Sequence, residues 1–232
     1  MLKGKRVMIT GASRGIGLEF VRQLINAGAK VIAAARHPEK SPHLLQLSQD
    51  HPQSLSTVVL DVADETSIHA ACESLSGMGI DLLINNAGVF FDRRETFDNI
   101  GADKILDTFR VNVIGPLLVS QAMLPFLRRS NSPTIVNITS LMGSIADNTS
   151  GGSYGYRISK AALNMLAKTM SVDLKDLTVL NLHPGWVKTE MGGGQAPLSP
   201  EESVKGMISV IEHSSREKSG TFADYAGRDL PW

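Results

Sequence analysis

The chain has 232 residues, of which 42% are hydrophobic and 20% are charged. This length and composition are ordinary for one globular α/β domain with a sizeable core. Because 23 basic and 23 acidic side chains cancel to a net charge of zero, the overall charge gives no indication of a nucleic-acid partner or an anionic membrane partner.

Three further features narrow the class of protein. Cys72 is the single cysteine, which excludes an internal disulfide and fits a reducing compartment, so we expect a cytoplasmic protein. No secretory segment or uninterrupted apolar stretch of about 18 residues is present, so we expect neither export nor a membrane span. The six histidines are scattered, and we expect no metal site.

The first predicted elements are a strand, a glycine-rich turn and a helix. The apolar run Val7–Ile9 predicts a buried strand, and the turn Gly11-Ala-Ser-Arg-Gly15-Ile-Gly17 follows it. A helical pattern then continues to Gly28, which is typical of a helix C-terminus. Three glycines can serve the turn alone, but between a strand and a helix they also let the backbone approach a pyrophosphate. We expect phosphate binding, although the spacing differs from Gly-x-Gly-x-x-Gly.

The second predicted strand, Val31–Ala35, ends at Arg36. In dinucleotide-binding folds the end of this strand faces the adenosine ribose, where an acidic residue binds the 2′-hydroxyl and an arginine accommodates a 2′-phosphate. Arg14 of the glycine-rich turn supplies a second cation. Both arginines can instead be solvated surface side chains, but their positions favour NADP(H) over NAD(H).

Two further strands end in polar groups. Ser56–Leu60 predicts a strand closed by Asp61-Val62, and Asp64 caps the helix after it. Asp81–Ile84 predicts the next strand, which runs into Asn85-Asn86-Ala87-Gly88. Ligands gather at the carboxyl ends of strands in open α/β sheets. Asp61 and the amides are therefore candidates for a cofactor site, although the second run can also be a plain turn.

A long helix and a fifth strand follow. Asp103 to Leu127 predicts one helix, in which Asn112 interrupts the apolar face and needs hydrogen-bond partners. Pro116 predicts a local kink or disturbed turn. The strand Ile135–Thr139 delivers Ser140 at its end, and a loop continues to Gly152.

Tyr156 and Lys160 are the candidates for acid–base chemistry. They open a segment whose helical pattern covers Ala161 to Lys175, and residues four apart lie on one face of a helix. An ammonium beside a phenol favours phenolate, so we expect the pKa of Tyr156 to be lowered from about 10 towards working pH. Such a group can give a proton to an oxygen and take it back. A Tyr-x-x-x-Lys pair also occurs by chance, so its weight comes from its neighbours.

The C-terminal part completes the alternation of strands and helices. Val179–Leu182 predicts a sixth strand before Pro184-Gly185, Glu201–Glu212 a helix, and Gly220–Ala223 a short seventh strand. The Gly- and Pro-rich stretch Glu190–Pro200 predicts a mobile substrate loop. We expect one α/β domain with a doubly wound (Rossmann) fold, a seven-stranded parallel sheet of order 3-2-1-4-5-6-7 and helices on both faces.

Together these motifs resemble the short-chain dehydrogenase/reductase family over nearly the whole chain. The matching pieces are Thr10 to Gly17, Asp61, Asn85 to Gly88, Asn112, Ser140, Tyr156 with Lys160, and Pro184-Gly-Trp-Val-Lys-Thr189. The stretches 146–152, Tyr156–Lys160 and His183–Thr189 look like the C-factor and sniffer-type carbonyl reductase branch. The gap between Ser140 and Tyr156 is longer than is usual in the family. Ser144 and Ser153 therefore compete for the serine role, although the position directly after the strand favours Ser140.

The resemblance implies a role for each matching residue. Tyr156 is implied as the proton donor, Lys160 as the modifier of its pKa and a ribose ligand, Ser140 as the group that holds the carbonyl, and Asn112 as the anchor of a water relay. The residues implied to bind NADP(H), besides Tyr156 and Lys160, are Gly11, Ser13, Arg14, Gly15, Ile16, Gly17, Arg36, Asp61, Val62, Asn86, Ala87, Gly88, Pro184, Gly185, Val187 and Thr189.

These roles predict an NADPH-dependent oxidoreductase that reduces the carbonyl of a ketone, aldehyde or quinone to an alcohol. The alternative is a nucleotide-binding signalling or regulatory protein of the C-factor type on the same scaffold, since a fold does not determine a function. The helices of Asn112 and Tyr156 are the family's usual dimer surface, so the resemblance also implies a homo-oligomer, a dimer or a tetramer. We expect a small-molecule carbonyl or alcohol substrate and neither a nucleic-acid nor a membrane partner.

Overall fold

Strands and helices alternate along the chain in the computed structural model, which describes residues 2–75, 77–93 and 95–232. The strands are β1 (Arg6–Thr10), β2 (Lys30–Ala35), β3 (Leu55–Val59), β4 (Leu82–Asn85), β5 (Thr134–Ile138), β6 (Thr178–His183) and β7 (Thr221–Asp224). The α-helices are α1 (Gly15–Asn26), α2 (Pro42–Asp50), α3 (Glu65–Ser74), α4 (Ala102–Phe109), α5 (Gly115–Leu127), α6 (Tyr154–Asp173) and α7 (Pro200–Glu212). The short segments are the π-helical η2 (Arg110–Ile114) and the 3-10 turns η1 (Pro38–Lys40), η3 (Leu141–Gly143) and η4 (Arg216–Lys218).

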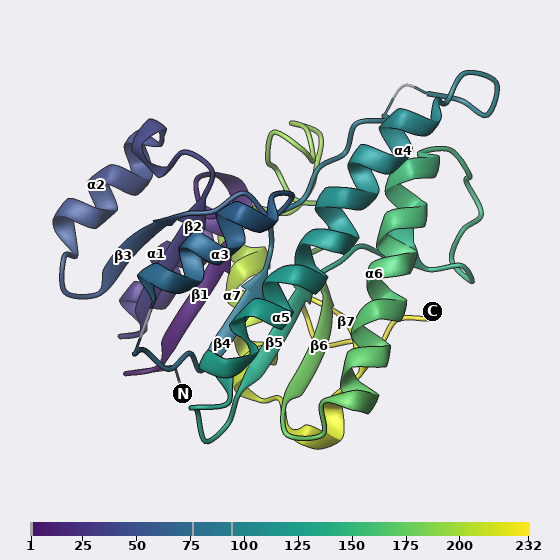
Figure 1. Cartoon of the computed structure of the whole chain (residues 1–232). Coiled ribbons are helices and arrows are strands. Elements are labelled where there is room, and N and C mark those ends of the chain that lie inside the picture. The colour runs from purple at the N-terminus through teal and green to yellow at the C-terminus, as the bar shows by residue number, and fades with distance from the viewer. Residues whose placement is uncertain (1, 76, 94) are drawn as a thin grey trace.

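The seven strands form one parallel sheet in the order β3-β2-β1-β4-β5-β6-β7 (Figure 1). The predicted fold class and strand order are therefore confirmed. The winding reverses between β1 and β4, which pair directly with Val7 opposite Leu82. In sheets of this kind, ligands bind in the crevice outside the carboxyl ends of the strands at the reversal.

An apolar core covers each face of the sheet. Along β1, Val7 and Ile9 belong to the core that includes α1 and α7, whereas Met8 belongs to the core that includes α3, α5 and α6. Both faces are buried, so the strands are continuous apolar runs, as expected of a parallel sheet. Each fully buried side chain of this size contributes about 1.5–3 kcal/mol of hydrophobic stabilisation.

The helix predicted from 103 to 127 is interrupted. α4 and α5 are joined by the π-helical segment η2, which ends two residues before Pro116. Pro116 has no N–H to donate to the C=O of Asn112, so the ladder of helical bonds changes there. This confirms the predicted disturbed turn.

Among the described residues, Ala102–Leu127 is long and apolar enough by length and composition to cross a membrane, although 44% of its most apolar window is buried inside the fold. Core helices pass the same test.

Three asparagines form a row across the sheet, which we call the asparagine row. Asn85 of β4 is in register with Asn137 of β5, and Asn137 is in register with Asn181 of β6. The Nδ2 of Asn85 donates to the Oδ1 of Asn137 and to the Oγ of Ser120 on α5, both at 3.0 Å. The Nδ2 of Asn181 donates to the C=O of Asn164 on α6 at 3.4 Å. The buried amides thus connect the sheet to the helices that cover it.

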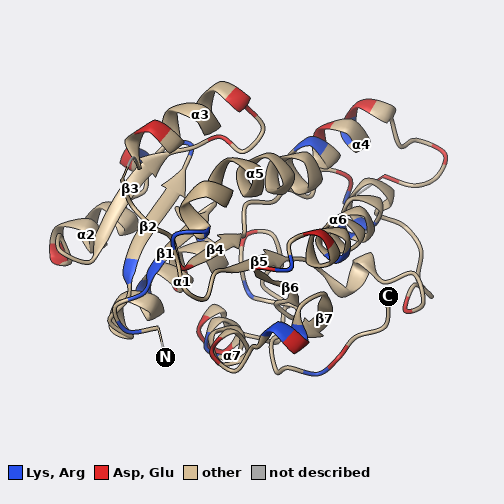
Figure 2. Cartoon of the chain, turned by 60° about the horizontal axis from the view of Figure 1, so that its bottom comes forward, with Lys and Arg blue, Asp and Glu red and all other residues tan. Residues whose placement is uncertain are grey.

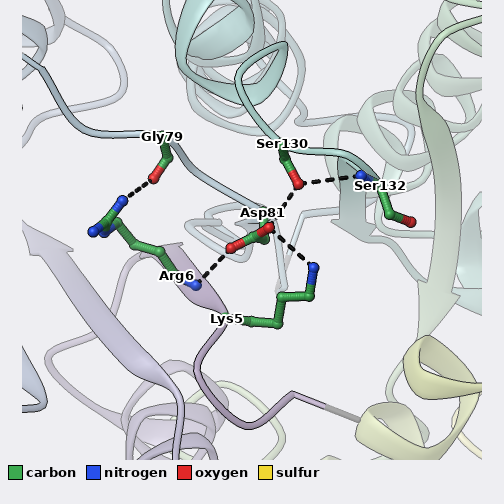
Figure 3. A network of polar contacts seen from close by, with 6 residues as sticks. All are labelled: Lys5, Arg6, Gly79, Asp81, Ser130 and Ser132. Carbon is green, nitrogen blue, oxygen red and sulfur yellow. Dashed lines mark hydrogen bonds and ion pairs between the residues drawn. The ribbon is translucent and has the colours of Figure 1, made fainter.

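Asp81 joins three segments at the end of the sheet where the strands begin, opposite their carboxyl ends (Figure 3). Its carboxylate accepts hydrogen bonds from the Oγ of Ser130 at 2.6 Å, the N–H of Arg6 at 2.9 Å and the Nζ of Lys5 at 3.1 Å. Burial by itself raises the pKa of Asp81, but the bonds from Ser130, Arg6 and Lys5 outweigh it and lower the pKa below its ordinary value. The carboxylate therefore stabilises the starts of β1 and β4 only while it is ionised.

Charged side chains are spread over the elements, and Lys and Arg are interspersed with Asp and Glu (Figure 2). Among the described residues, this mixing of signs does not indicate a surface that attracts a polyanion over a long range. No group of three or more His, Cys, Asp or Glu side chains that could hold a metal ion is found in the described part of the chain.

Candidate active site

The glycine-rich turn between β1 and α1 packs directly against the end of β4. Gly11 (φ +66°) and Gly15 (φ +54°) have left-handed backbone conformations, which favour glycine. At Gly17, a Cβ would lie 2.2 Å from the C=O of Gly11 and 2.6 Å from the Nδ2 of Asn86. The same Nδ2 donates to the C=O groups of Thr10 and Gly11 at 2.9 Å and 3.1 Å. Asn86 therefore fixes the turn, and only glycine fits at Gly17.

The start of α1 can bind an anion. Arg14 is its N-cap residue, but it makes no side-chain capping bond, and the first turn contains no acidic residue. The first N–H groups of an α-helix have no intrahelical partner, and the helix dipole favours negative charge beside them. The backbone from Gly15 to Gly17, with Ile16 partly packed on the core, therefore fits a pyrophosphate.

The two arginines predicted to bind a 2′-phosphate have different surroundings. The Nη1 of Arg14 donates to the Oε2 of Glu190 at 2.6 Å, and both side chains are exposed. Arg36, directly after β2, is exposed, and no described carboxylate lies within ion-pair distance of it. The sequence did not predict that Ser41 would contact the glycine-rich turn. Its Oγ donates to the C=O of Ser13 in that turn at 2.7 Å and also caps α2. The Ser-Pro pair that begins α2 was the available sequence signal.

The ends of β3 and β4 bring the other predicted cofactor residues to the same edge. The Oδ1 of Asp61 accepts the N–H of Ala63 at 2.9 Å, and Val62 is buried beside Gly115. The N–H groups of Asn86 and Ala87 both donate to the Oγ1 of Thr10 at 3.1 Å. A Cβ at Gly88 would lie 3.4 Å from the Oδ1 of Asn112 and 3.8 Å from the Nζ of Lys160. Gly88 thus lies beside two of the candidate catalytic residues, Asn112 and Lys160.

α6 begins at Tyr154, so both Tyr156 and Lys160 lie within the helix. Both are buried, and the Nζ of Lys160 is 5.7 Å from the centroid of the Tyr156 ring. The prediction that they share one face is confirmed. Tyr154 faces elsewhere and contacts the ring of Phe97.

The predicted lowering of the Tyr156 pKa is wrong. Burial raises the pKa of Tyr156 to about 12, and a hydrogen bond with Ser140 and the charge of Arg93 offset only part of that rise. Burial also lowers the pKa of Lys160 to about 8, and its Nζ donates to the C=O of Ile138 at 2.9 Å rather than to the phenol. Tyr156 therefore holds its proton at neutral pH.

The three candidate serines have different partners. The Ser140 hydroxyl is close enough to Tyr156 to act against the rise in its pKa, and its Oγ accepts the N–H of Met142 at 3.1 Å. The Oγ of Ser144 instead accepts the N–H of Asp147 at 3.0 Å. Ser153 makes no side-chain capping bond and has a left-handed backbone, φ +50°. Of the three, Ser140 is the serine placed to act with Tyr156.

Asn112 has its amide fully engaged. It is buried in η2, its Oδ1 accepts the N–H of Val89 at 2.9 Å, and its Nδ2 donates to the C=O of Val89 at 2.9 Å and the Oγ of Ser159 at 3.0 Å. The predicted need for partners is confirmed. Asn112 thereby ties the segment after β4 to α6.

Asp92 is a further residue of the site that the sequence pattern did not reveal. It is fully buried, and its carboxylate accepts the N–H of Gly155 at 2.7 Å and the N–H of Tyr156 at 3.2 Å. A negative charge at a helix N-terminus is stabilising. Asp92 thus caps the helix of Tyr156 from the loop after β4, and because the two residues are 64 apart in sequence no local motif could indicate the contact.

The Pro184 to Thr189 segment is held in place by contacts with the chain that follows it. Gly185 has φ +82°, and a Cβ there would lie 2.8 Å from Leu198. The Oγ of Ser203 donates to the C=O of Pro184 at 2.6 Å, and Val187 is buried. These contacts fix the segment between β6 and α7.

The loop beyond it contacts the glycine-rich turn. A Cβ at Gly15 would lie 3.5 Å from the methyl group of Thr189, and the Oγ1 of Thr189 accepts the N–H of Gly192 at 3.0 Å. The Nε1 of Trp186 donates to the C=O of Gly192 at 2.8 Å. The loop is therefore hydrogen-bonded to itself here, and its ordering on ligand binding stays a prediction.

Comparison with known proteins agrees with this geometry. The family model described as short chain dehydrogenase matches residues 5–197. The C-signal protein of Myxococcus xanthus is 50% identical over 156 residues, which cover 66% of this chain and 93% of that protein. The NADPH-bound carbonyl reductase from chicken fatty liver has a TM-score of 0.92 and 39% identity, with both chains fully covered. The carbonyl reductase Sniffer of D. melanogaster has a TM-score of 0.93 and 30% identity, with 99% of this chain and 100% of that chain covered. The chain belongs to the short-chain dehydrogenase/reductase family.

Proposed function

We propose that the chain is an NADPH-dependent reductase of a ketone, aldehyde or quinone carbonyl. The observation that carries the proposal is that Ser140, Tyr156 and Lys160 are buried together: Ser140 is close enough to Tyr156 to act on its pKa, and Lys160 lies on the same helix face as Tyr156. These groups lie at the carboxyl ends of the strands, where Gly88 is close to Asn112 and Lys160 and the glycine-rich turn packs on the end of β4. A pair of hydroxyls beside a dinucleotide crevice suits the polarisation of a carbonyl oxygen.

The proposed cofactor is NADP(H). The uncapped start of α1 fits the pyrophosphate, and the exposed Arg36 and Arg14 can pair with the 2′-phosphate. The chicken carbonyl reductase was crystallised with NADPH bound. Dissociation constants for NADPH and NADH test the assignment. We expect Arg36→Asp to remove a preference of about tenfold or more, the range expected for one charge-assisted contact.

In the proposed mechanism this chain positions the carbonyl and supplies the proton. Bound NADPH supplies the hydride. The hydroxyls of Ser140 and Tyr156 donate hydrogen bonds to the carbonyl oxygen, on which negative charge develops. Tyr156 then gives its proton to that oxygen, which it can do because its raised pKa keeps it protonated at neutral pH. The ammonium of Lys160, held by the C=O of Ile138, stabilises the phenolate that results.

NADPH oxidation against a panel of ketones, aldehydes and quinones tests the proposal. Tyr156→Phe removes one hydroxyl, and turnover should fall by about a hundredfold to ten-thousandfold, the usual contribution of a general acid. The NADPH dissociation constant should hardly change. Tyr154→Phe is the matched control and should be mild, because Tyr154 contacts Phe97 instead. An active Tyr156→Phe variant would falsify the mechanism.

A second candidate function is nucleotide-dependent signalling. Its support is the identity with the C-signal protein, which covers 93% of that protein. The hydroxyl pair of Ser140 and Tyr156 favours the enzyme over this alternative, because binding alone does not need a buried acid. Tight NADPH binding without turnover of any carbonyl in the panel would favour signalling.

We also propose that the chain forms a homo-oligomer through the surface of α4, η2 and α6. Exposed apolar side chains lie along these elements. α4 and η2 contribute Leu106 and Ile114. On α6 the exposed apolar residues recur every seven positions, at Ile158, Met165 and Val172. Exposed apolar patches of this kind mark association surfaces. Sedimentation of the unaltered chain should give a dimer or tetramer, and Met165→Glu should shift it towards the monomer.

A further inference from the structure

Arg93, in the loop between β4 and α4, lies beside the proposed acid. Its guanidinium carbon is 4.9 Å from the centroid of the Phe90 ring. Phe90 in turn stacks on Tyr156, with ring centroids 4.2 Å apart and an interplanar angle of 18°. Burial raises the pKa of Tyr156, and the charge of Arg93 is close enough to act against that rise. A cation therefore lies within electrostatic reach of the reacting oxygen.

The charge of Arg93 has no carboxylate partner among the described residues. The two described carboxylates nearest to it in sequence are engaged elsewhere: Asp92 with the first N–H groups of α6, and Glu95 with the Nζ of Lys104. Glu190, in the loop across the crevice, pairs with Arg14. An arginine that is left without a counter-ion beside an active site is available to bind an anionic ligand.

Arg93 instead contacts a second loop. Its Nη2 donates to the backbone C=O of Met191, in the loop that follows β6. This bond joins the loops after β4 and β6. A carboxylate is a stronger acceptor than a neutral carbonyl, since charge-assisted bonds are roughly twice as strong, and it can accept two parallel bonds from a guanidinium. A carboxylate ligand can therefore replace the Met191 carbonyl.

The two loops that Arg93 joins also carry large exposed apolar side chains. They are Phe91 after β4 and Trp186 and Met191 after β6, and the guanidinium of Arg93 itself lies over the Phe90 ring. Ligand sites combine apolar side chains with a few charged groups that set orientation. Such loops suit a ligand with an aromatic or aliphatic body, and Arg93 supplies the charged contact.

We infer that the substrate carries a carboxylate at the end away from its carbonyl. Arg93 binds that carboxylate while Ser140 and Tyr156 bind the carbonyl oxygen. This inference rests on the proposed reductase function and names its substrate class: apolar ketones or aldehydes that bear an acid group. Arg93 is then a specificity-determining residue, and it acts through binding rather than through the chemical step.

Matched acids and esters test the inference. The probes are para-acetylbenzoate and para-acetylphenylacetate, each beside its methyl ester, with NADPH saturating. The unaltered chain should prefer each acid by about tenfold or more in kcat/KM, as expected for a charge-assisted bond. In Arg93→Met the KM for the acids should rise until acid and ester are used about equally. Raised salt should weaken the preference for acids in the unaltered chain, and it should have no such effect on Arg93→Met.

Arg129 provides the matched control. Its guanidinium carbon lies 5.6 Å from the centroid of Phe126, and it donates to the C=O of Met78 at 3.3 Å, so it makes the same two kinds of contact far from the crevice. Arg129→Met should leave the preference for acids intact. Arg93→Lys should keep part of it, because the charge remains but the planar pair of donors is lost.

The outcomes separate this inference from the proposed function. Equal use of acid and ester by the unaltered chain would overturn the role of Arg93 and leave the reductase standing. An equal fall for acid and ester in Arg93→Met would show that Arg93 acts on the loops or on Tyr156 and not on a carboxylate of the substrate, which also overturns the inference. Failure to reduce either pair or any carbonyl in the panel would remove the proposed function, and the inference with it.

Discussion

The carboxylate of Asp92 accepts the backbone N–H of Tyr156 at 3.2 Å. This bond and the one from Gly155 hold the first turn of α6 from a different part of the chain. The position of the Tyr156 hydroxyl relative to Ser140 therefore depends on a loop that lies more than sixty residues earlier in the sequence.

Asp92→Ala should destabilise the fold and slow the reaction together. Loss of a buried charged acceptor leaves two N–H groups of α6 unpaired, so we expect the free energy of unfolding to fall by about 1–3 kcal/mol. Turnover should also fall, because the first turn of α6 loosens around Tyr156. Asp64→Ala is the control, since Asp64 caps α3 at the surface and its loss should affect stability alone. Normal turnover in Asp92→Ala would contradict this positioning role.

Lys160 should set a pH limit on cofactor capture. Its pKa is lowered by burial to about 8, so its positive charge is present below that pH and is lost as the pH rises through it. We expect kcat/KM for NADPH, which reports groups of the cofactor-free protein, to fall above about pH 8. This fall above pH 8 should be absent in Lys160→Met, which should also bind NADPH more weakly. It should persist in Lys168→Met, which alters a lysine further along α6. A profile that stays flat from neutral to pH 9 would refute the assignment.

Glu190 should compete with the cofactor for Arg14. The exposed pair must open if Arg14 is to bind a 2′-phosphate, and exposed ion pairs contribute little to stability. We expect Glu190→Gln to tighten NADPH binding by about twofold to fivefold and to change NADH binding less. Titration of both cofactors with both proteins gives the ratio. An unchanged ratio would mean that Arg14 does not contact the 2′-phosphate.

Asp81 should make the fold sensitive to acid. Its pKa is lowered in the folded chain, so its contribution is present above the unfolded value of about 3.9 and is lost as the pH falls through the folded value. At neutral pH, Asp81→Asn should reduce the free energy of unfolding by about 1–2 kcal/mol. The difference from the unaltered chain should vanish in acid. Asp176→Asn removes an exposed pair with Arg128 and should do much less; equal effects of the two variants would argue against the Asp81 network.

Local patterns were sufficient to predict the sheet and most of the site. Buried parallel strands are apolar runs, so Val7–Ile9 and Val31–Ala35 were readable without the structure. Pro116 predicted the disturbed turn because its missing N–H acts within its own helix. Ser140 and Tyr156 were singled out because each occupies a marked position, one at a strand end and one on a helix face, and their catalytic roles stay a prediction.

Contacts between distant segments could not be predicted in this way. Asp92 meets Tyr156, and Arg14 meets Glu190, only after the chain has folded. The direction of the Tyr156 pKa shift was wrong for a related reason. The helical spacing placed Lys160 nearby, but burial, which the whole fold determines, has the larger effect.

The asparagine row also has a consequence for how the sheet assembles. Strands of a parallel sheet pair only after long chain segments close, which is slow and exposes wrong pairings. A slip of one residue would turn each amide to the opposite face, where Val136 and Leu180 belong to an apolar core. Each hydrogen bond that the amides make in the native register would then be lost, at a cost of about 1–3 kcal/mol. The asparagine row therefore favours the native alignment of β4, β5 and β6 over pairings that are one residue out of register.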